Sequence, residues 1–314
     1  MGLDLSGMLI CVRCGIPLPP EVSWEPSGTS CTNCGTEVPV VRGIPRFVAS
    51  DAYAGSFSFE WNRHRLTQLD TLTSRESEAT FQEKTGLTRE QVAGRLVLDV
   101  GCGMGRFADV VERWGGRVVG VDLSLAVDAA HANLAGRANV RILQADLFHL
   151  PFRPGTFDLV YSLGVLHHTQ DCEQAFRRLV PFARPGGRLC VWVYGGMGAW
   201  TRTARLYRLV TTRMPHRLLY TLCYAAIPWY HVCRLPGIGP LLFTLVPIRL
   251  HPDPAWRVLD TFDWYSPKYQ SLHTFPEVYR WFRSEGLTDI ALLESPVAVA
   301  GSRPDSLAGP GAIK

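Results

Sequence analysis

A glycine-rich turn between an apolar run and a helix constrains the fold of this chain more than any other feature. Residues 96–100 are apolar apart from Asp99, and they have the length of a strand that is buried on both faces. The turn at 101–105 follows at once, and residues 106–114 have the pattern of a helix. Glycines let a ligand approach the backbone closely, and the first turn of a helix offers it free N–H groups. The sequence therefore predicts a ligand site where this strand ends.

Short apolar runs and helical stretches continue to alternate along the chain after this unit. The next predicted strands cover residues 117–122, 139–146, 156–162 and 188–194. Such an alternation is typical of a parallel sheet with helices on both faces. A helix with a capping box at Thr274 and Glu277 precedes two last strands, at 289–293 and 297–300. The predicted fold class is α/β, a Rossmann-like, doubly wound sheet of seven strands.

An acidic residue closes each of the two strands that follow the glycine turn. Asp122 stands 21 residues after Gly101, where it could accept hydrogen bonds from two ribose hydroxyls. Asp146 ends the third strand, a position that favours a ligand over a simple helix cap. The turn and Asp122 together imply a cofactor with a ribose. The dinucleotide pattern G-x-G-x-x-G is not met, because Arg106 takes the place of its third glycine.

These segments resemble the motifs of one enzyme family. The pattern D-x-G-x-G-x-G at 99–105 looks like motif I of the class I S-adenosylmethionine-dependent methyltransferases, and Asp122 matches their ribose-binding acid. Ala-Asp-Leu at 145–147 matches their adenine-binding turn. Residues 157–168 match the pattern FDxVxxxxxLHH of strand four, and residues 179–189 match the start of strand five.

The resemblance covers about residues 95–195 and implies a UbiE-like, type 11 methyltransferase core that binds S-adenosyl-L-methionine. In this family the glycines cradle the methionine part of the cofactor, one acid holds the ribose, and the next acid binds the adenine amine. Carried over to this chain, the implied cofactor-binding residues are Asp99, Gly101, Gly103, Gly105, Asp122, Leu123, Asp146, Leu147 and Ser162.

Two adjacent histidines follow the fourth strand, close to where the resemblance places the methyl group. Methyl transfer from a sulfonium depends on the placement of the nucleophile, and an O–H or N–H nucleophile also needs a base. Histidine titrates near neutral pH and could take that proton. His167 and His168 are therefore the candidate catalytic residues. The alternative is that one or both have a packing role.

Four of the nine cysteines form two pairs near the N-terminus. Cys11, Cys14, Cys31 and Cys34 have the spacing C-x2-C-x16-C-x2-C, which is typical of a tetrahedral zinc site. Because all four ligands are thiolates, we expect structural Zn²⁺; redox dithiols or free thiols are the alternative. Residues 38–48, VPVVRGIPRFV, resemble the end of the Trm112-type zinc ribbons, a family of small proteins that bind class I methyltransferases.

The segment after the fifth predicted strand has an unusual charge. Between residues 174 and 252 the chain has eleven arginines and no aspartate or glutamate, although its net charge is only +4. One predicted helix carries Arg202, Arg205 and Arg208 on one face, and its other face carries Trp200, Tyr207, Val210 and Met214. We expect residues 196–274 to form a helical cap that binds the methyl acceptor. Contact with an anionic membrane surface is the sharper alternative, and nucleic acid is a less expected partner because no RNA-binding motif is found.

These features predict five segments in the chain. They are a zinc ribbon (8–48), a linker with lid helices (49–94), the methyltransferase core (95–195 with 275–302), the helical insert (196–274) and a tail (303–314). No apolar stretch reaches the roughly 20 residues that a membrane helix needs, and the N-terminus lacks the pattern of a secretory signal. We therefore expect a cytoplasmic protein whose contact with a membrane is peripheral.

The expected reaction is methyl transfer from S-adenosyl-L-methionine to a small-molecule or lipid-linked acceptor. A ribosomal RNA methyltransferase that uses its zinc ribbon to contact RNA is the first alternative. The ribbon is nearly neutral, which counts against phosphate binding; its charged residues are Arg13, Arg42, Arg46, Glu21, Glu25 and Glu37. A non-catalytic cofactor-binding partner protein is the second alternative, and the intact cofactor motif argues against it.

Overall fold

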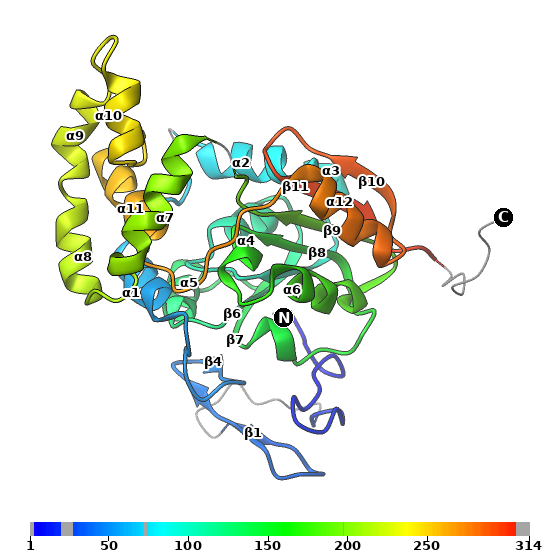
Figure 1. The fold of residues 1–314 in the computed structure, drawn as a ribbon. Coiled ribbons are helices and arrows are strands. Elements are labelled where there is room, and N and C mark those ends of the chain that lie inside the picture. The colour runs from blue at the N-terminus through cyan, green and yellow to red at the C-terminus, as the bar shows by residue number, and fades with distance from the viewer. Residues whose placement is uncertain (1–2, 20–27, 72–73, 197, 306–314) are drawn as a thin grey trace.

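The structure is a computed structural model that describes residues 3–19, 28–71, 74–196 and 198–305 (Figure 1). Part of the expected ribbon, including Glu21 and Glu25, lies outside the described residues. Most of the expected tail, residues 306–314, lies outside them as well.

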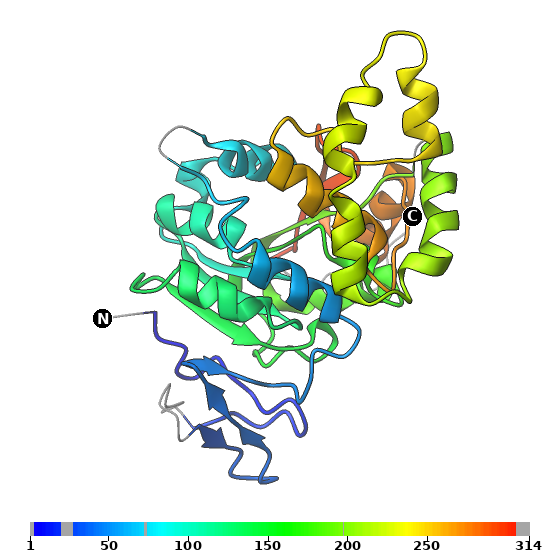
Figure 2. The ribbon, with the colours of Figure 1, turned by 90° about the vertical axis from the view of Figure 1, so that its left-hand side faces the viewer.

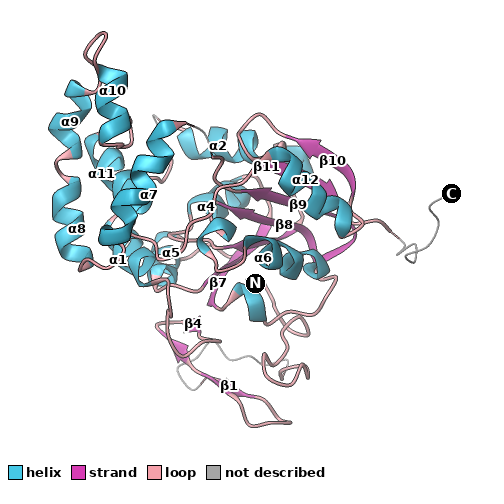
Figure 3. Ribbon diagram, in the orientation of Figure 1, coloured by secondary structure: helices cyan, strands magenta, loops and turns pink. Residues whose placement is uncertain are grey.

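A seven-stranded sheet forms the centre of the molecule (Figure 3). Its strands are β5 Leu96–Val100, β6 Arg117–Asp122, β7 Val140–Gln144, β8 Phe157–Leu163, β9 Ala183–Trp192, β10 Thr288–Leu292 and β11 Ala298–Ser302. They lie in the order β10-β11-β9-β8-β5-β6-β7, and every pairing is parallel except those of β11 with its two neighbours. The predicted α/β, Rossmann-like fold with seven strands is confirmed.

The order of the strands reverses between β5 and β8. From β5 the chain proceeds to β6 and β7 on one side, whereas β8 and β9 lie on the other side of β5. The chain after β5 therefore continues toward one edge of the sheet and the chain after β8 toward the other, which is the topology that leaves a crevice at the carboxyl ends of the strands. Ligands of doubly wound sheets bind in crevices of this kind.

Helices cover both faces of this sheet. The helices of the described chain are α1 Gly55–Arg63, α2 Glu76–Thr85, α3 Arg89–Val92, α4 Arg106–Arg113, α5 Ala126–Asn133, α6 Cys172–Leu179, α7 Ala199–Thr211, α8 His216–Cys223, α9 Ala226–Val232, α10 Gly239–Leu245, α11 Pro254–Tyr265 and α12 Phe275–Ser284. Residues of β5 alternate between two apolar clusters, as the period of a strand requires. Leu98 and Val100 pack with residues of α6 and α12, and Val97 packs with residues of α2, α4 and α5.

The insert consists of helices α7 to α11, with α11 at its centre. Helix α11 contacts α7, α8 and α9, and it also contacts α1 from the segment before the core. Helices α8, α9 and α10 project away from the sheet (Figures 1 and 2). Both views place the α9–α10 end of the insert and the N-terminal strands at opposite ends of the molecule. None of the helices in the described ranges combines the length and apolar character needed to cross a bilayer.

The expected pattern of the first insert helix is wrong in two respects. Helix α7 ends at Thr211, because the chain turns toward Pro215, so Met214 lies beyond the helix. Arg208 does not belong to an outward basic face: its guanidinium donates to the carbonyl oxygens of Trp264 at 2.8 Å and Pro267 at 2.6 Å. The apolar residues Tyr207 and Val210 are exposed instead.

The N-terminal segment contains two short antiparallel strand pairs and joins the sheet at its β7 edge. The pairs are β1 Thr29–Ser30 with β2 Glu37–Val38, and β3 Val40–Val41 with β4 Ile44–Pro45. Directly after β4, Arg46 forms a parallel bridge with Gln144, and the Phe47 N–H donates to the Gln144 carbonyl oxygen at 2.8 Å. The segment thus adds backbone pairing to the last strand of the sheet.

A buried arginine strengthens this junction. Arg46 is 6% exposed, and its guanidinium lies 2.6 Å from the Asp128 carboxylate of α5. It also donates to the Gln144 side-chain oxygen at 3.0 Å. One side chain therefore links the N-terminal segment to both a helix and a strand of the core.

Arg46→Ala is expected to lower the free energy of unfolding by about 3 kcal/mol, because it leaves a partly buried carboxylate without its partner. Arg42→Ala is the matched control. Arg42 lies 3.7 Å from the same carboxylate, but its side chain is 78% exposed, and such pairs contribute about 0–1 kcal/mol. Urea denaturation of both variants measures the difference, and equal losses would show that the buried pair does not fasten the junction.

Candidate functional site

A cavity of about 770 Å³ lies at the carboxyl ends of β5, β6, β7 and β8. One part of its wall consists of the loops after these strands, and the other part consists of side chains from α1, α2, α7 and α11. The volume lies within the range of about 300–1,000 Å³ that is typical of small-molecule sites. The structure brings seven of the predicted site residues to this wall: Gly101, Gly103, Asp122, Leu123, Asp146, Leu147 and His168.

The glycine turn after β5 needs glycine for both conformation and space. Gly101 has a φ of +80°, and a Cβ there would lie 2.2 Å from a side-chain carbon of Val165 in the loop after β8. The Gly101 N–H donates to the Val121 carbonyl oxygen at 2.7 Å, which holds the turn against β6. Gly105, with a φ of +88°, precedes α4 and packs against Leu134, so it shapes the turn from outside the cavity wall.

Asp122 joins this turn to the end of β6. Its Oδ2 accepts the Gly103 N–H at 2.9 Å, and its Oδ1 accepts the backbone N–H and the hydroxyl of Ser124 at 2.8 and 2.7 Å. Burial raises the pKa of Asp122, while these hydrogen bonds lower it. A carboxylate has about four acceptor positions, so Asp122 can still accept a hydrogen bond from a ligand in the cavity.

Asp146 lies on the same wall beyond β7, at the start of a short 3-10 turn, Leu147–His149. Its Oδ1 accepts the Phe148 N–H at 3.0 Å, and its Oδ2 lies 3.5 Å from the Nδ1 of His149. Leu123 and Leu147 line the cavity beside the two acids. This arrangement offers two carboxylates and two apolar side chains to a single ligand.

Two other predicted residues lie behind the cavity wall. Asp99 is 2% exposed, and burial raises its pKa to about 8, with Asp122 adding to the effect. Ser162 is fully buried, and its hydroxyl donates to the Val100 carbonyl oxygen at 2.9 Å, which links β8 to β5. The structure thus places both residues beneath the glycine turn, and neither lines the cavity.

The two candidate catalytic histidines have different surroundings. His168 lines the cavity, whereas His167 is fully buried behind it and stacks on the Tyr194 ring at 3.8 Å. The Nδ1 of His168 lies 3.1 Å from the Tyr269 carbonyl oxygen, so this nitrogen is the donor and Nε2 keeps its lone pair. Burial lowers the pKa of His168 to about 3 and the pKa of His167 well below its usual range. Both rings are therefore neutral near pH 7.

Sequence reasoning missed several polar residues of the cavity wall. Glu60 comes from α1, and Asp260 and Asp263 come from α11; they lie in the same wall as Tyr194, which follows β9. The Tyr194 hydroxyl donates to Asp263 at 2.5 Å, and Asp260 forms an ion pair with Arg249 at 3.1 Å. One signal was present in the sequence: the insert contains only three acidic residues, and two of them are these aspartates, one helical turn apart.

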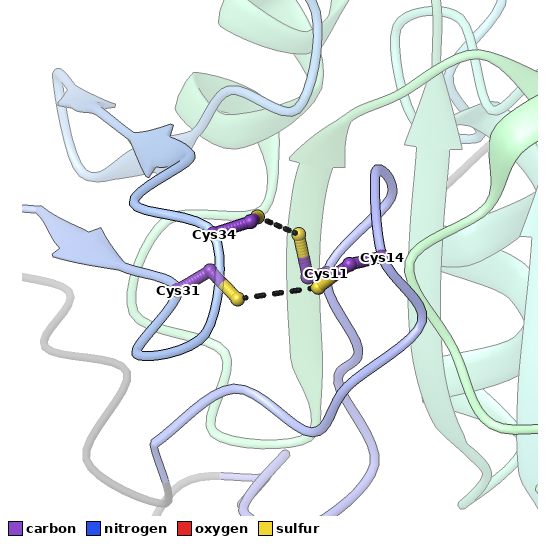
Figure 4. Close-up of side chains that lie close together, drawn as sticks. All are labelled: Cys11, Cys14, Cys31 and Cys34. Carbon is purple, nitrogen blue, oxygen red and sulfur yellow. Dashed lines mark hydrogen bonds between the residues drawn. The ribbon is translucent and has the colours of Figure 1, made fainter.

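The four N-terminal cysteines converge on one point (Figure 4). Their sulfur atoms all lie within 4.8 Å of one another, with 3.6 Å between Cys11 and Cys34 and 3.5 Å between Cys14 and Cys31. A tetrahedral Zn²⁺ with Zn–S bonds of about 2.3 Å holds its sulfurs about 3.8 Å apart. The four thiols therefore fit a metal ion, and no other cluster of the described residues offers such a ligand set.

Comparison with known families agrees with this geometry. Residues 98–191 match a family model described as a methyltransferase domain. The match begins within β5 and ends within β9, so it contains the glycine turn, both acids and both histidines.

Three curated proteins illustrate the similarity. The demethylmenaquinone methyltransferase of Thermobifida fusca is 32% identical over 40% of this chain and 55% of its own length. The ubiquinone biosynthesis O-methyltransferase of Albidiferax ferrireducens is 37% identical over 33% of this chain and 41% of its own. A probable tRNA methyltransferase 9B of Bos taurus is 31% identical over 34% of this chain and 23% of its own.

The chain thus spans about half the length of the first of these proteins and less of the other two. The central part of this chain is therefore a class I S-adenosylmethionine-dependent methyltransferase core.

Proposed function

We propose that this protein transfers a methyl group from S-adenosyl-L-methionine to a small-molecule or lipid-linked acceptor. The observation that carries the proposal is the composition of the cavity wall, which has the glycine turn, Asp122 and Asp146 on one side and helices of the insert on the other. The names of two relatives, which concern demethylmenaquinone and ubiquinone biosynthesis, favour an acceptor of this class.

The residues of the wall suit the parts of that cofactor. Asp122 would accept hydrogen bonds from the ribose hydroxyls, and Asp146 would accept one from the adenine amine, with Leu123 and Leu147 against the ring. When bound, the cofactor supplies a methyl group on a sulfonium, which leaves easily once a nucleophile is aligned with the C–S bond. The Nε2 of His168 has no hydrogen-bond partner among the described residues, so it would accept a hydrogen bond from the acceptor, although a pKa of about 3 makes the ring a weak base near pH 7.

Asp122→Asn is expected to weaken the binding of S-adenosyl-L-methionine by roughly 10- to 100-fold, because hydrogen bonds to a charged group contribute about 1.5–3 kcal/mol. Isothermal titration measures the change. Glu90→Gln, an exposed acid of α3, is the control and should bind as the wild type does. An unchanged affinity in the Asp122 variant would remove the basis of the cofactor assignment.

We also propose that the four cysteines hold Zn²⁺ in a structural site. All four ligand positions are occupied by thiols, so the site has no open position for a substrate. Cys11 and Cys31 belong to the same apolar cluster as Leu150 and Phe152 of the core. The metal would therefore hold the N-terminal segment in the shape that docks on the sheet.

The purified protein should contain about one zinc ion per chain, and Cys14→Ser should lose most of it, since three thiolates bind less tightly than four. Cys233→Ala, which removes a buried thiol of the insert, should keep the metal. Elemental analysis measures the content, and thermal unfolding should show a lower midpoint for Cys14→Ser. A zinc-free wild type that unfolds at the same temperature with and without added zinc would refute the site.

The insert is the proposed contact with a membrane surface. Thirteen of the eighteen large hydrophobic side chains that are exposed among the described residues lie between positions 206 and 250. They form stripes at helical spacing, such as Leu206, Leu209 and Val210 on α7 and Leu241 and Leu245 on α10. Exposed arginines at 202, 205, 213, 217 and 234 accompany them. Apolar stripes with positive charge suit a surface of anionic lipid.

The wild type is expected to sediment with vesicles that contain phosphatidylglycerol and to remain in solution with vesicles of phosphatidylcholine alone. Leu241→Glu should weaken this binding about tenfold, because it puts a charge into the apolar layer. Leu292→Glu is the matched control, since Leu292 is 54% exposed on β10 and Leu241 is 60% exposed on α10. Equal binding of the two variants would contradict the proposed surface.

An RNA acceptor is the second candidate, favoured by the tRNA methyltransferase among the relatives. The N-terminal segment offers little positive surface for it. Arg46 is buried in its ion pair with Asp128, which leaves Arg13 and Arg42 as the exposed arginines in the described part of this segment. A small-molecule or lipid-linked acceptor therefore remains the better proposal.

A further inference from the structure

A group of carboxyl side chains in the cavity wall has no role in the cofactor site. Glu60 of α1 and Asp260 and Asp263 of α11 all line the cavity. The two aspartates lie one turn apart on the same helix face, and α1 and α11 are in contact. They do not form a metal site, since the four cysteines are the only such cluster among the described residues that could hold an ion.

Glu60 is the member of this group whose side chain lacks hydrogen-bond partners. Its side chain is 1% exposed, and neither carboxyl oxygen has a hydrogen-bond partner among the described residues. Buried polar groups of native proteins nearly always have partners. A carboxyl group that lines a cavity under these conditions points to a ligand that supplies the missing partner.

The charges around Glu60 indicate the kind of ligand. Burial raises the pKa of Glu60 well above its usual range, and the next largest effects, those of Asp263 and Asp260, raise it further. Two arginines of the cavity wall have other partners, since Arg208 donates to two backbone carbonyls and Arg249 pairs with Asp260. A positively charged group would relieve the repulsion among these carboxylates.

Aromatic side chains of the same cavity wall also suit a cation. Trp200 and Trp264 both line the cavity and stack on each other at 5.0 Å with an angle of 22°. The Tyr194 hydroxyl binds Asp263 at 2.5 Å, and the pKa of Asp263 is raised to about 6 by burial. Carboxylates together with aromatic faces form the usual environment of a bound ammonium group.

We propose that Glu60, together with Asp263, binds the ammonium group of the methyl acceptor, so that the acceptor is an amine. The inference rests on the proposed methyltransferase function and names its substrate class. The proposal also explains why α1 lies at the cavity, where its Trp61 is next to Gly103 of the glycine turn. Helix α1 thereby spans the cofactor side and the acceptor side of one cavity.

The Glu60 carboxylate would also take a proton from the nitrogen before the methyl group is transferred. A protonated amine has no lone pair, so one proton must move from nitrogen to the carboxylate, which gives a neutral amine and a carboxylic acid. The nitrogen lone pair then forms the new N–C bond while the C–S bond breaks and its electrons pass to sulfur. The carboxylic acid releases its proton to solvent when the product leaves.

The test uses the full-length protein saturated with S-adenosylhomocysteine, whose own amino group then fills any site that serves the cofactor. Isothermal titration compares 2-phenylethylamine with its neutral analogue 2-phenylethanol. The wild type should bind the amine at least about tenfold more tightly than the alcohol. Glu60→Gln, which keeps the shape of the side chain, should abolish this preference, and Asp263→Asn should reduce it. Glu83→Gln, an exposed acid of the same cavity, should preserve it.

Two outcomes would overturn the inference. If Glu60→Gln weakens S-adenosylhomocysteine about tenfold but keeps the preference for the amine, the carboxylate serves the cofactor and not the acceptor. If the wild type and Glu60→Gln have the same affinity for the amine, the same affinity for the alcohol and the same affinity for S-adenosylhomocysteine, Glu60 is not an ammonium site. A wild type that does not bind S-adenosylhomocysteine would refute the methyltransferase proposal but not the ammonium site. The amine can then be titrated into the protein without S-adenosylhomocysteine, and this titration still reports on Glu60.

Discussion

The hydrogen bonds that Asp122 accepts hold the ligand cavity in shape. Through Gly103 and Ser124, one carboxylate fastens the glycine turn after β5 to the residues that lead from β6 into α5. On the opposite side, Val165 packs against Gly101, so the loop after β8 closes on the same turn. The reversal of strand order between β5 and β8 provides the space for the cavity, and these contacts fix the part of its wall that the glycine turn and Asp122 form.

The sheet and this part of the cavity wall could be predicted from the sequence because their signals are local. Strands buried on both faces are apolar runs, and the residues that end them, such as Asp122 and Asp146, follow directly in the chain. The prediction was less able to separate residues that line the cavity from those behind it. Ser162 and Asp99 lie at strand ends too, but their side chains point into the sheet packing.

The part of the cavity wall that contains Glu60 and Asp263 could not be predicted in the same way. Glu60 and Asp263 belong to helices far apart in the sequence, and only the packing of α1 on α11 brings them together. The periodicity of α7 correctly indicated an amphipathic helix but not which side would be covered. Arg208 turns inward because backbone carbonyls of the α11 end accept its hydrogen bonds, and the leucines beside it remain outside.

The junction at Gln144 has a consequence for the behaviour of the whole sheet. Strand β7 is the last strand on its side, and an open edge of this kind is a template on which another polypeptide can assemble. Arg46 and Phe47 occupy part of that edge. The segment that carries the four cysteines therefore covers part of an edge that would otherwise be open to another chain, and its removal is expected to make the remaining core more prone to aggregation.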